Sequence, residues 1–392
     1  LGVTGGIAAY KAVEISRRLV DAGAHVMPVM TNAATRFVGE TTLSALASEP
    51  VRTRLWDDPQ TPIPHTKLGQ SADLILVAPA TARIISAYAT GLATDLLSNV
   101  LLATRAPVVI CPAMHTEMWE NPAVADNIAT LRARGVHVVD PESGRLAGGD
   151  SGAGRLASPE TIVAAVERVL GPGDLAGVRV VVSAGGTREP IDAVRVLANR
   201  SSGKQGYAIA AEAAARGAQV TLVSTVDLSV PAGVTVARVD TAAEMQAALE
   251  HLAPASDVVV MAAAVADFRP KAPATHKLKK HDGVPEIVLE PTPDILAGLG
   301  AGKRPGQVLV GFAAETDDLA ANATSKLVNK RVDMIVANDV GAPATGFGYD
   351  TNAVTIFLAD GDPVAVPLSD KRAIAAAVLD QIVARRARLG NN

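Results

Sequence analysis

Small and hydroxylated residues gather where predicted strands end in the first half of the chain. Residues 5–11, Gly-Gly-Ile-Ala-Ala-Tyr-Lys, join a strand to the N-terminus of a helix. The first N–H groups of a helix have no partner within it and carry the positive end of its dipole, so this turn favours a phosphate group. Thr31 and Asn32 follow the next strand, and Thr81 and Ala82 follow the third. Parallel sheets bind ligands at these ends, which predicts a flat ligand-binding floor, although such glycines also suit a tight connection that binds nothing.

A second junction of this kind lies in the other half of the chain. Residues 183–192 read Ser-Ala-Gly-Gly-Thr-Arg-Glu-Pro-Ile-Asp, and Arg195, Asn199 and the string Arg-Ser-Ser-Gly-Lys at 200–204 follow before a helix. Neither of two standard nucleotide-binding signatures is present in full in the chain. Gln205 stands where a Walker motif places Ser or Thr to hold a metal, and residues 152–157 fit the dinucleotide pattern but follow a polar loop rather than a strand.

Apolar spacing predicts the elements that position these junctions. An amphipathic helix, ended by Gly23, is indicated by the stripe Ala8, Ala12, Ile15, Leu19 and Ala22. Strands are predicted at residues 25–30, 73–78, 106–110 and 135–139, then at 178–183 and 219–224. The last helix is expected to have Ser369 as its cap and to run to about Leu389. This order predicts an α/β protein with two doubly wound, Rossmann-like domains and mainly parallel sheets, residues 1–172 and 173–392.

Length, charge and cysteine content exclude several classes of protein. The 392 residues carry 36 basic and 40 acidic side chains, a net charge of −4, which argues against binding to nucleic acid or anionic lipid. No apolar run approaches the roughly 20 residues of a membrane span, and no secretory leader is found. The first strand is so short that we expect the numbered chain to begin inside it. Cys111 is the single cysteine, which excludes an internal disulfide and fits a cytoplasmic location.

The first half closely resembles the flavin-dependent cysteine decarboxylases, whose known members act on phosphopantothenoylcysteine. The resemblance is carried by the three strand ends together with His65-Thr66-Lys67-Leu68, Pro112-Ala113-Met114 and Met118-Trp119. It implies that FMN, with its ring system at a subunit contact, is bound by Gly5, Gly6, Ile7, Thr31, Asn32, Thr81 and Ala82. It also gives His65 the position of the active-site histidine, where the alternative is a histidine that only caps a helix.

Two positions depart from this family's pattern. His115 stands where the family has the asparagine that binds the substrate carboxylate, and an imidazole can also donate a hydrogen bond or carry a charge. Gly148 stands where the family has a flap cysteine that supplies a proton in the last step. The flap string is Ala147-Gly148-Gly149-Asp150, so the proton donor is left open. Cys111 is a candidate substitute, but a cysteine that ends a buried strand is more typical of a core.

The second half resembles phosphopantothenate–cysteine ligase of the bacterial, CTP-using kind. The resemblance runs through residues 183–204, 261–268, 276–280, 293–296, 311–316 and 337–339. It implies a CTP site formed by Met261, Ala262, Ala263, Asp267, Lys277, Pro293, Asp294, Ile295, Leu296, Phe312, Lys326 and Lys330. Lys277 would reach the phosphates from a mobile loop, and Asn199 would stabilise the activated acyl intermediate. Lysines fit a triphosphate in a net-acidic protein, and Mg²⁺, with Asp267 as a tentative ligand, would share that charge.

The two resemblances together imply a fused enzyme of coenzyme A biosynthesis. The ligase half would activate phosphopantothenate with CTP, release pyrophosphate, and let cysteine displace CMP to give phosphopantothenoylcysteine. The decarboxylase half would convert that product to phosphopantetheine and CO₂ with FMN. Family resemblance also suggests trimers of the flavin domain and dimers of the ligase domain, hence a dodecamer. Two alternatives stay open: a nicotinamide-dependent oxidoreductase, and a regulatory protein that keeps FMN without catalysis.

Overall fold

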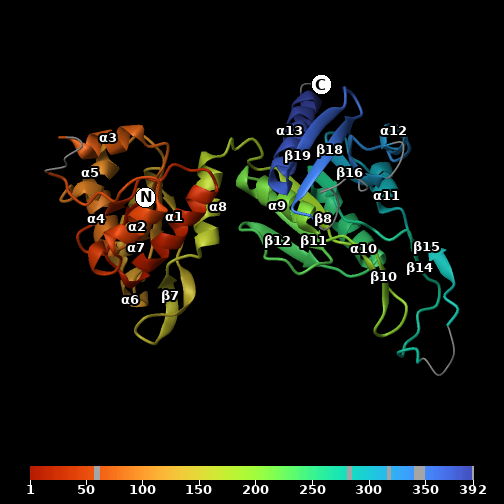
Figure 1. Cartoon of the computed structure of the whole chain (residues 1–392), viewed down its shortest axis with the longest axis horizontal. Coiled ribbons are helices and arrows are strands. Elements are labelled where there is room, and N and C mark those ends of the chain that lie inside the picture. Colours follow the sequence, from red (N-terminus) through yellow and green to blue (C-terminus); the bar gives the residue numbers. More distant parts are fainter. Residues whose placement is uncertain (57–61, 280–284, 316–318, 340–348, 391–392) are drawn as a thin grey trace. The chain divides into compact units, whose positions relative to one another are not determined.

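The chain folds as two compact units, Leu1–Gly171 and Pro172–Asn392. The computed structural model describes residues 1–56, 62–279, 285–315, 319–339 and 349–390 (Figure 1). The division falls one residue from the predicted boundary, at the Gly-Pro-Gly-Asp string. None of the described helices combines the length and the apolar character needed to cross a bilayer.

The first unit is built on a five-stranded parallel sheet in the order β2, β1, β3, β4, β5. Its strands are β1 (Gly2–Val3), β2 (Val29–Met30), β3 (Ile75–Ala80), β4 (Val108–Pro112) and β5 (His137–Val138), and a hairpin of β6 (Glu142–Arg145) and β7 (Ser151–Arg155) is added. The helices are η1 (Ile7–Tyr10), α1 (Lys11–Asp21), η2 (Ala34–Arg36), α2 (Glu40–Leu46), α3 (Pro64–Ser71), α4 (Ala82–Thr90), α5 (Leu96–Ala103), α6 (Thr116–Trp119), α7 (Pro122–Ala133) and α8 (Pro159–Leu170).

Both faces of this sheet are covered, as the apolar runs predict. Every residue of β3 and β4 is buried. Successive residues belong to different core clusters: Val77 and Ile110 pack on one side, whereas Leu76 and Cys111 pack on the other. A strand with helices on both faces needs apolar side chains in both directions, which explains the continuous Val and Ile content.

The second unit is built on an eight-stranded sheet in the order β12, β11, β8, β13, β16, β17, β18, β19. Its strands are β8 (Arg179–Ala184), β11 (Gln219–Ser224), β12 (Val234–Arg238), β13 (Val258–Met261), β16 (Val308–Glu315), β17 (Met334–Asp339), β18 (Thr351–Leu358) and β19 (Val364–Asp370). The six strands from β12 to β17 pair in parallel, and β18 and β19 pair antiparallel. The predicted fold class, doubly wound with mainly parallel sheets, is confirmed.

Helices and two small ribbons complete the second unit. The helices are α9 (Lys204–Ala215), α10 (Ala242–Leu252), η3 (Ala253–Ala255), α11 (Ile295–Ala301), α12 (Leu319–Asn329) and α13 (Lys371–Gly390). One ribbon pairs β9 (Arg188–Pro190) with β10 (Val196–Ala198), and the other pairs β14 (Phe268–Pro270) with β15 (Leu289–Pro291). The two ribbons project from the sheet (Figure 1).

Some element ends differ from the prediction for identifiable reasons. The strand predicted at residues 25–30 is reduced to Val29–Met30, because Pro28 has no N–H to contribute to a strand ladder. The cap of α13 is Asp370 rather than Ser369: the Asp370 Oδ1 accepts the Ala373 N–H at 2.7 Å, whereas Ser369 Oγ donates to the Pro367 carbonyl. Aspartate and serine are similar helix caps, so the sequence alone did not separate two neighbouring candidates.

Candidate active sites

The first unit has a cavity of about 790 Å³ at the carboxyl ends of β1, β3 and β4. The chain passes from β1 outward to β2 and then returns to the other side of β1 as β3. Ligands of open α/β sheets bind where the strand order reverses in this way. Five of the seven residues predicted to bind FMN line the cavity, namely Gly5, Gly6, Ile7, Thr81 and Ala82.

The two sides of this crevice are tied together by Thr4. Its hydroxyl donates to the Pro79 carbonyl at 2.7 Å and accepts the Thr81 N–H at 3.0 Å. Gly5 allows the turn after β1 to lie against the segment after β2, since a Cβ at this position would be 2.4 Å from the Cβ of Ala33. The glycine turn therefore serves close packing, and any substitution would push the two strand ends apart.

The lining of the cavity includes groups that suit an anion. Helix η1 starts at Gly6 without a side-chain cap, and the first turn of the helix lines the cavity. Among the described lining residues four are cationic, Lys11, Arg83, Arg145 and Arg155, and none is acidic. Helix N–H groups and surrounding cations are what a phosphate group needs.

The rest of the cavity is apolar, and several of its side chains are exposed. Ile7 is 63%, Tyr10 61% and Met118 47% exposed, although all three are large apolar or aromatic residues. A cavity that offers cations for an anionic group and a wide apolar surface fits a flavin phosphate, which carries a flat aromatic ring system at one end and a phosphate at the other.

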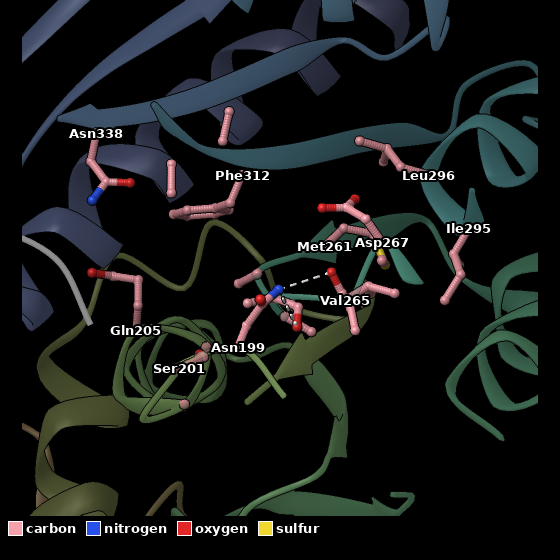
Figure 2. A pocket seen from close by; sticks show the side chains of 18 of the residues that line it. Asn199, Ser201, Gln205, Met261, Val265, Asp267, Ile295, Leu296, Phe312 and Asn338 are labelled. Atoms are coloured by element: carbon pink, nitrogen blue, oxygen red, sulfur yellow. Dashed lines mark hydrogen bonds between the residues drawn. The ribbon is translucent and has the colours of Figure 1, made fainter. Parts of the chain in front are cut away.

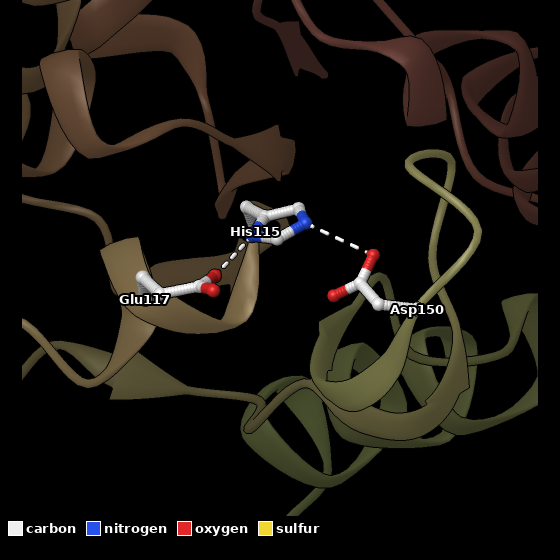
Figure 3. A group of neighbouring side chains, drawn as sticks. All are labelled: His115, Glu117 and Asp150. Atoms are coloured by element: carbon white, nitrogen blue, oxygen red, sulfur yellow. Dashed lines mark hydrogen bonds and ion pairs between the residues drawn. The ribbon is translucent and has the colours of Figure 1, made fainter.

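His115 lies at the edge of this cavity, between two carboxylates (Figure 3). Its Nδ1 hydrogen-bonds to Glu117, and its Nε2 is 3.1 Å from Asp150 Oδ1. These contacts raise the pKa of His115, first through Glu117 and then through Asp150. The carboxylates lie at different ring nitrogens, whereas a metal ion takes one nitrogen of an imidazole, so the arrangement favours a charged imidazolium over a metal ligand.

Three predicted residues of the first unit do not line its cavity. Thr31 is buried directly behind the glycine turn, and its Oγ1 has no hydrogen-bond partner within the described residues. Asn32 is exposed beside it. His65 is on α3, at the end of the unit opposite α6 and β7 (Figure 1), and its buried Nδ1 likewise has no partner among the described residues.

Two other sequence features of the first unit, Cys111 and residues 152–157, are not placed for catalysis or for phosphate binding. Cys111 is fully buried in an apolar cluster, and burial strongly raises the pKa of its thiol, so it is a poor source of protons. The dinucleotide-like string at residues 152–157 begins in strand β7 of the hairpin. It does not open a helix, so it does not form the phosphate loop of a dinucleotide-binding fold.

The second unit has a polar cavity of about 470 Å³, which also lies where the strand order reverses, between β8 and β13. Eleven of the twelve residues predicted to bind CTP line it: Met261, Ala262, Ala263, Asp267, Pro293, Asp294, Ile295, Leu296, Phe312, Lys326 and Lys330. Figure 2 shows Gln205 and Asn338 at one end, Ile295 and Leu296 at the other, and Phe312 between them. The Asp267 carboxylate points into the cavity.

Four lysines line this cavity: Lys204, Lys326 and Lys371 on α9, α12 and α13, and Lys330 directly after α12. Lys330 is 3.2 Å from Asp294, which also caps α11, and Lys204 is 2.5 Å from Asp350. Burial and then the charge of Lys204 lower the pKa of Lys371. A concentration of positive charge in a net-acidic chain marks a site for a polyanion.

Asn199 is held at the floor of the cavity. Its Nδ2 donates to the carbonyl oxygens of Val265, at 3.1 Å, and Ala264, at 3.5 Å (Figure 2). Gly186 permits this approach, because a Cβ there would be 2.7 Å from the Asn199 carbonyl oxygen. The strand end after β8 and the strand end after β13 are thus joined through one amide.

Lys277 does not line the cavity formed by its own chain. It is exposed on the segment that follows β14, and its neighbour Leu278 donates its N–H to Asp192 at 3.1 Å. The Asp192 carboxylate also accepts the N–H groups of Val194 and Arg195. Burial alone would raise the pKa of Asp192, but these backbone donors and Arg195 outweigh it and lower that pKa. Lys280 and Thr316, which end two of the strings that carry the ligase resemblance, lie outside the described residues.

Sequence reasoning missed the far end of the second cavity. Lys371 and Asn352 line it, and the Gln205 Nε2 donates to the Lys371 carbonyl at 3.1 Å. The Gln205 Oε1 is buried without a hydrogen-bond partner among the described residues. No local sequence motif predicts that these residues line a cavity, since Lys371 is simply the first residue of the last helix. Only the antiparallel return of β18 and β19 brings them to the cavity.

Both halves of the chain match families of known proteins, and relatives match it over nearly its whole length. The flavoprotein family matches residues 1–171, and the C-terminal domain family of DNA/pantothenate metabolism flavoproteins matches residues 175–385. A coenzyme A biosynthesis bifunctional protein of Mycobacterium bovis is 48% identical over 98% of this chain and 95% of its own length. A protein of the same name in Bacillus subtilis is 46% identical over 98% and 96%.

A solved structure titled as the C-terminal domain of a coenzyme A biosynthesis bifunctional protein is 41% identical, with a TM-score of 0.48 over 56% of this chain and all of that one. A PPC decarboxylase complexed with pantothenoylaminoethenethiol is 28% identical, with a TM-score of 0.39 over 42% of this chain and 93% of that one. The sequence identity over nearly the whole length is what settles the relationship. The chain therefore belongs to the family of bifunctional coenzyme A biosynthesis proteins.

Proposed function

We propose that the two units of this bifunctional coenzyme A biosynthesis enzyme divide two consecutive reactions. The second unit couples phosphopantothenate to cysteine with CTP and Mg²⁺. The first unit converts the resulting phosphopantothenoylcysteine to phosphopantetheine and CO₂ with FMN. The observation that carries this proposal is the contrast between the two cavities: one is mainly apolar with four cationic side chains in its lining, and the other is polar and lined by four lysines.

The second cavity has the parts that nucleotidyl activation of a carboxylate requires. Lys326 and Lys330 neutralise phosphate charge, and Asp267 supplies a carboxylate for Mg²⁺. A Mg²⁺ ion at such a site is held by one or two protein carboxylates together with the phosphates of the nucleotide. Phe312 offers a flat face for a base. The phosphopantothenate carboxylate attacks the α-phosphorus of CTP, pyrophosphate leaves, and the cysteine amine then displaces CMP. Asn199, fixed on two carbonyl groups, orients the activated acyl group.

The first cavity has the parts that an FMN site requires. Gly5, Gly6 and the uncapped start of η1 hold the phosphate, while Ile7 and Met118 provide apolar contacts for the ring system. When bound, FMN supplies reversible two-electron chemistry on the substrate thiol that makes loss of CO₂ feasible. The protein binds the substrate, orients its carboxylate with His115, and excludes water with the hairpin of β6 and β7.

Two predicted catalytic residues act from neighbouring copies of the chain. His65 lies outside the cavity of its own unit, and near it Ile63, which precedes α3, and Leu102, on the neighbouring α5, expose apolar side chains suited to self-association. Lys277 is on a projecting segment, beside a ribbon pair that exposes Val196 and Phe268. This proposal is consistent with trimeric contacts of the first unit and dimeric contacts of the second, and so with a dodecamer.

The test is a product assay on the purified chain, together with its visible absorption spectrum. We expect flavin absorption, CMP from CTP, phosphopantothenate and cysteine, and CO₂ from phosphopantothenoylcysteine. EDTA should stop CMP formation, and Mg²⁺ should restore it. No flavin binding together with no CMP would refute the assignment of both units.

Matched variants test the residue roles. Lys277→Ala should lower CMP formation by about 10²–10³-fold, because it removes a charge on the transferring phosphoryl group. Lys279→Ala removes an exposed lysine of the same segment and should leave the rate unchanged. His65→Asn and His115→Ala should each lose CO₂ release, and a mixture of the two re-assembled together should recover part of it if sites form between copies. Equal loss in Lys277→Ala and Lys279→Ala would refute the role of Lys277.

A further inference from the structure

His115 is positioned by two parts of the first unit that are far apart in sequence. Glu117, at its Nδ1, is on α6, which His115 directly precedes, whereas Asp150, at its Nε2, comes from the turn between β6 and β7 (Figure 3). The side chains of His115 and Asp150 are 41% and 45% exposed, so both can exchange protons with water. The imidazole therefore stands between the cavity on one side and solvent on the other.

Glycines fix the distance between the hairpin and the His115 segment. A Cβ at Gly154 would be 2.2 Å from the Met114 carbonyl oxygen, and one at Gly152 would be 2.3 Å from Thr116 Oγ1. The Met114 N–H donates to the Gly154 carbonyl at 3.0 Å. The hairpin thus lies directly on residues 114–116, and this contact sets the reach of Asp150 to His115.

Gly148 leaves the space in front of Nε2 open. A Cβ built at this position would be 3.3 Å from His115 Nε2 and 3.0 Å from Asp150 Oδ1. Any side chain here would therefore meet the imidazole and its carboxylate partner. With glycine, no side chain of residue 148 lies against Nε2, and the His115 side chain, paired there with Asp150, is among those that line the cavity.

The overall reaction of the first unit requires a proton at carbon. When the carboxylate leaves as CO₂, the electron pair of the broken C–C bond stays with the substrate, and a C–H bond must finally replace it. One proton is consumed for each CO₂, and the sum is redox-neutral, so no further oxidant or reductant is used. A group that gives this proton must be protonated at neutral pH and must regain its proton from water.

Resting on the proposed decarboxylase function of the first unit, we propose that His115 is the acid that delivers this proton, from Nε2 to the carbon that loses CO₂. Glu117 holds Nδ1–H and fixes the ring, and Asp150 guides a proton from water back to Nε2 after each turnover. The C–H bond forms as the Nε2–H bond breaks, and the imidazolium becomes a neutral imidazole. His115 is thus the acid as well as a contact for the carboxylate.

Charged groups around the imidazole support this role. Hydrogen bonds from the ring to Glu117 and then to Asp150 raise the pKa of His115, which favours the protonated form of the imidazole. The cations that line the same cavity are Lys11 from α1, Arg83 from α4, and Arg145 and Arg155 from the hairpin. Arg83 is paired with Asp95, so that its charge is balanced within α4 and α5.

The first experiment measures proton binding without catalysis. Histidine hydrogen–deuterium exchange, followed by mass spectrometry on the full chain without added flavin, gives the pKa of each imidazole. We expect the pKa of His115 to lie above the ordinary value for a histidine and to fall in Asp150→Asn. An unchanged pKa of His115 in Asp150→Asn would overturn the proposal.

The second experiment uses the loaded enzyme. His115→Ala should lower CO₂ release by about 10²–10⁴-fold, with partial recovery in added imidazole, whereas His137→Ala should not change it. Asp150→Asn should shift the loss of activity at high pH to lower pH, in parallel with the pKa of His115. CMP formation by the same chains reports that they are folded.

The outcomes separate this proposal from the function on which it rests. If wild-type chain releases no CO₂, the decarboxylase assignment fails. If wild-type chain is active but His115→Ala keeps more than about a tenth of its rate, or if imidazole restores nothing to a variant that still binds flavin, the role of His115 as the acid is wrong.

Discussion

Two glycines of α11 should respond in opposite directions to the same substitution. A Cβ at Gly300 would be 1.8 Å from the Lys330 carbonyl oxygen, about 1.6 Å short of ordinary contact at 3.4 Å. A Cβ at Gly298, one half-turn earlier, meets nothing within 4 Å. Gly300 is buried against the end of α12, and Gly298 is exposed. The two Gly→Ala changes therefore alter helix propensity equally but differ in the packing that the new methyl group meets.

The expected magnitudes follow from these distances. Gly300→Ala must displace α11 or the backbone at Lys330, and overpacking of this kind costs about 1–3 kcal/mol or more. Gly298→Ala should instead stabilise the second unit by about 0.5–1 kcal/mol, because glycine is the poorer helix former. For a unit of this size, 1 kcal/mol corresponds to a shift of about 2–4 °C in the midpoint of thermal unfolding.

The effect on ligand binding separates α11 from a general loss of stability. Asp294 and Leu296 at the start of α11 line the second cavity, and Lys330 lies opposite them. Gly300→Ala should therefore weaken CTP binding as well as lower the unfolding midpoint of the second unit. Calorimetry of the full chain, with and without CTP and Mg²⁺, measures both quantities. Equal midpoints and equal CTP affinities in the two variants would refute the packing argument.

Three further substitutions have definite expectations. Asp333→Asn should destabilise the second unit by up to about 3 kcal/mol, because the buried carboxylate pairs with Lys303 and Arg385, both of which water reaches in part; urea unfolding of the full chain measures it. Asp192→Asn should lower CMP formation by up to about 10²-fold without changing CO₂ release, since it loosens the segment of Lys277. Cys111→Ala should keep CO₂ release and flavin binding, and Cys111 should resist alkylation in the folded chain, because burial raises the pKa of its thiol; loss of CO₂ release in this variant would return Cys111 to the list of proton donors.

The parts of the fold that could be predicted are those with a local cause. The strand at residues 219–224 was predicted and observed with the same bounds, because its Val and Leu content lies between clear turns. Strand β2 was overestimated because Pro28 interrupts a run that otherwise looks continuous. Helix caps were missed by one residue where Ser369 and Asp370 are adjacent, since either side chain could accept the N–H bonds.

The candidate sites divide in the same way. Residues that follow a strand, such as Gly5 and Met261, could be placed at a cavity because strand order fixes where strand ends meet. Asp150 and Lys371 could not, since their approach depends on a hairpin and on the last antiparallel strands. His65 lies away from the cavity of its own chain, so the fold of one chain alone does not complete the predicted site.

Both cavities lie where strand order reverses, yet they differ in chemistry because different segments cover them. In the first unit the crevice between β1 and β3 is covered by α6 and the hairpin, which bring Met118, His115 and arginines. In the second unit the crevice between β8 and β13 is bordered by α11, which brings Ile295 and Leu296, and by α12 and the start of α13, which bring lysines. Connectivity thus fixes the place of a ligand, and the covering segments fix its type.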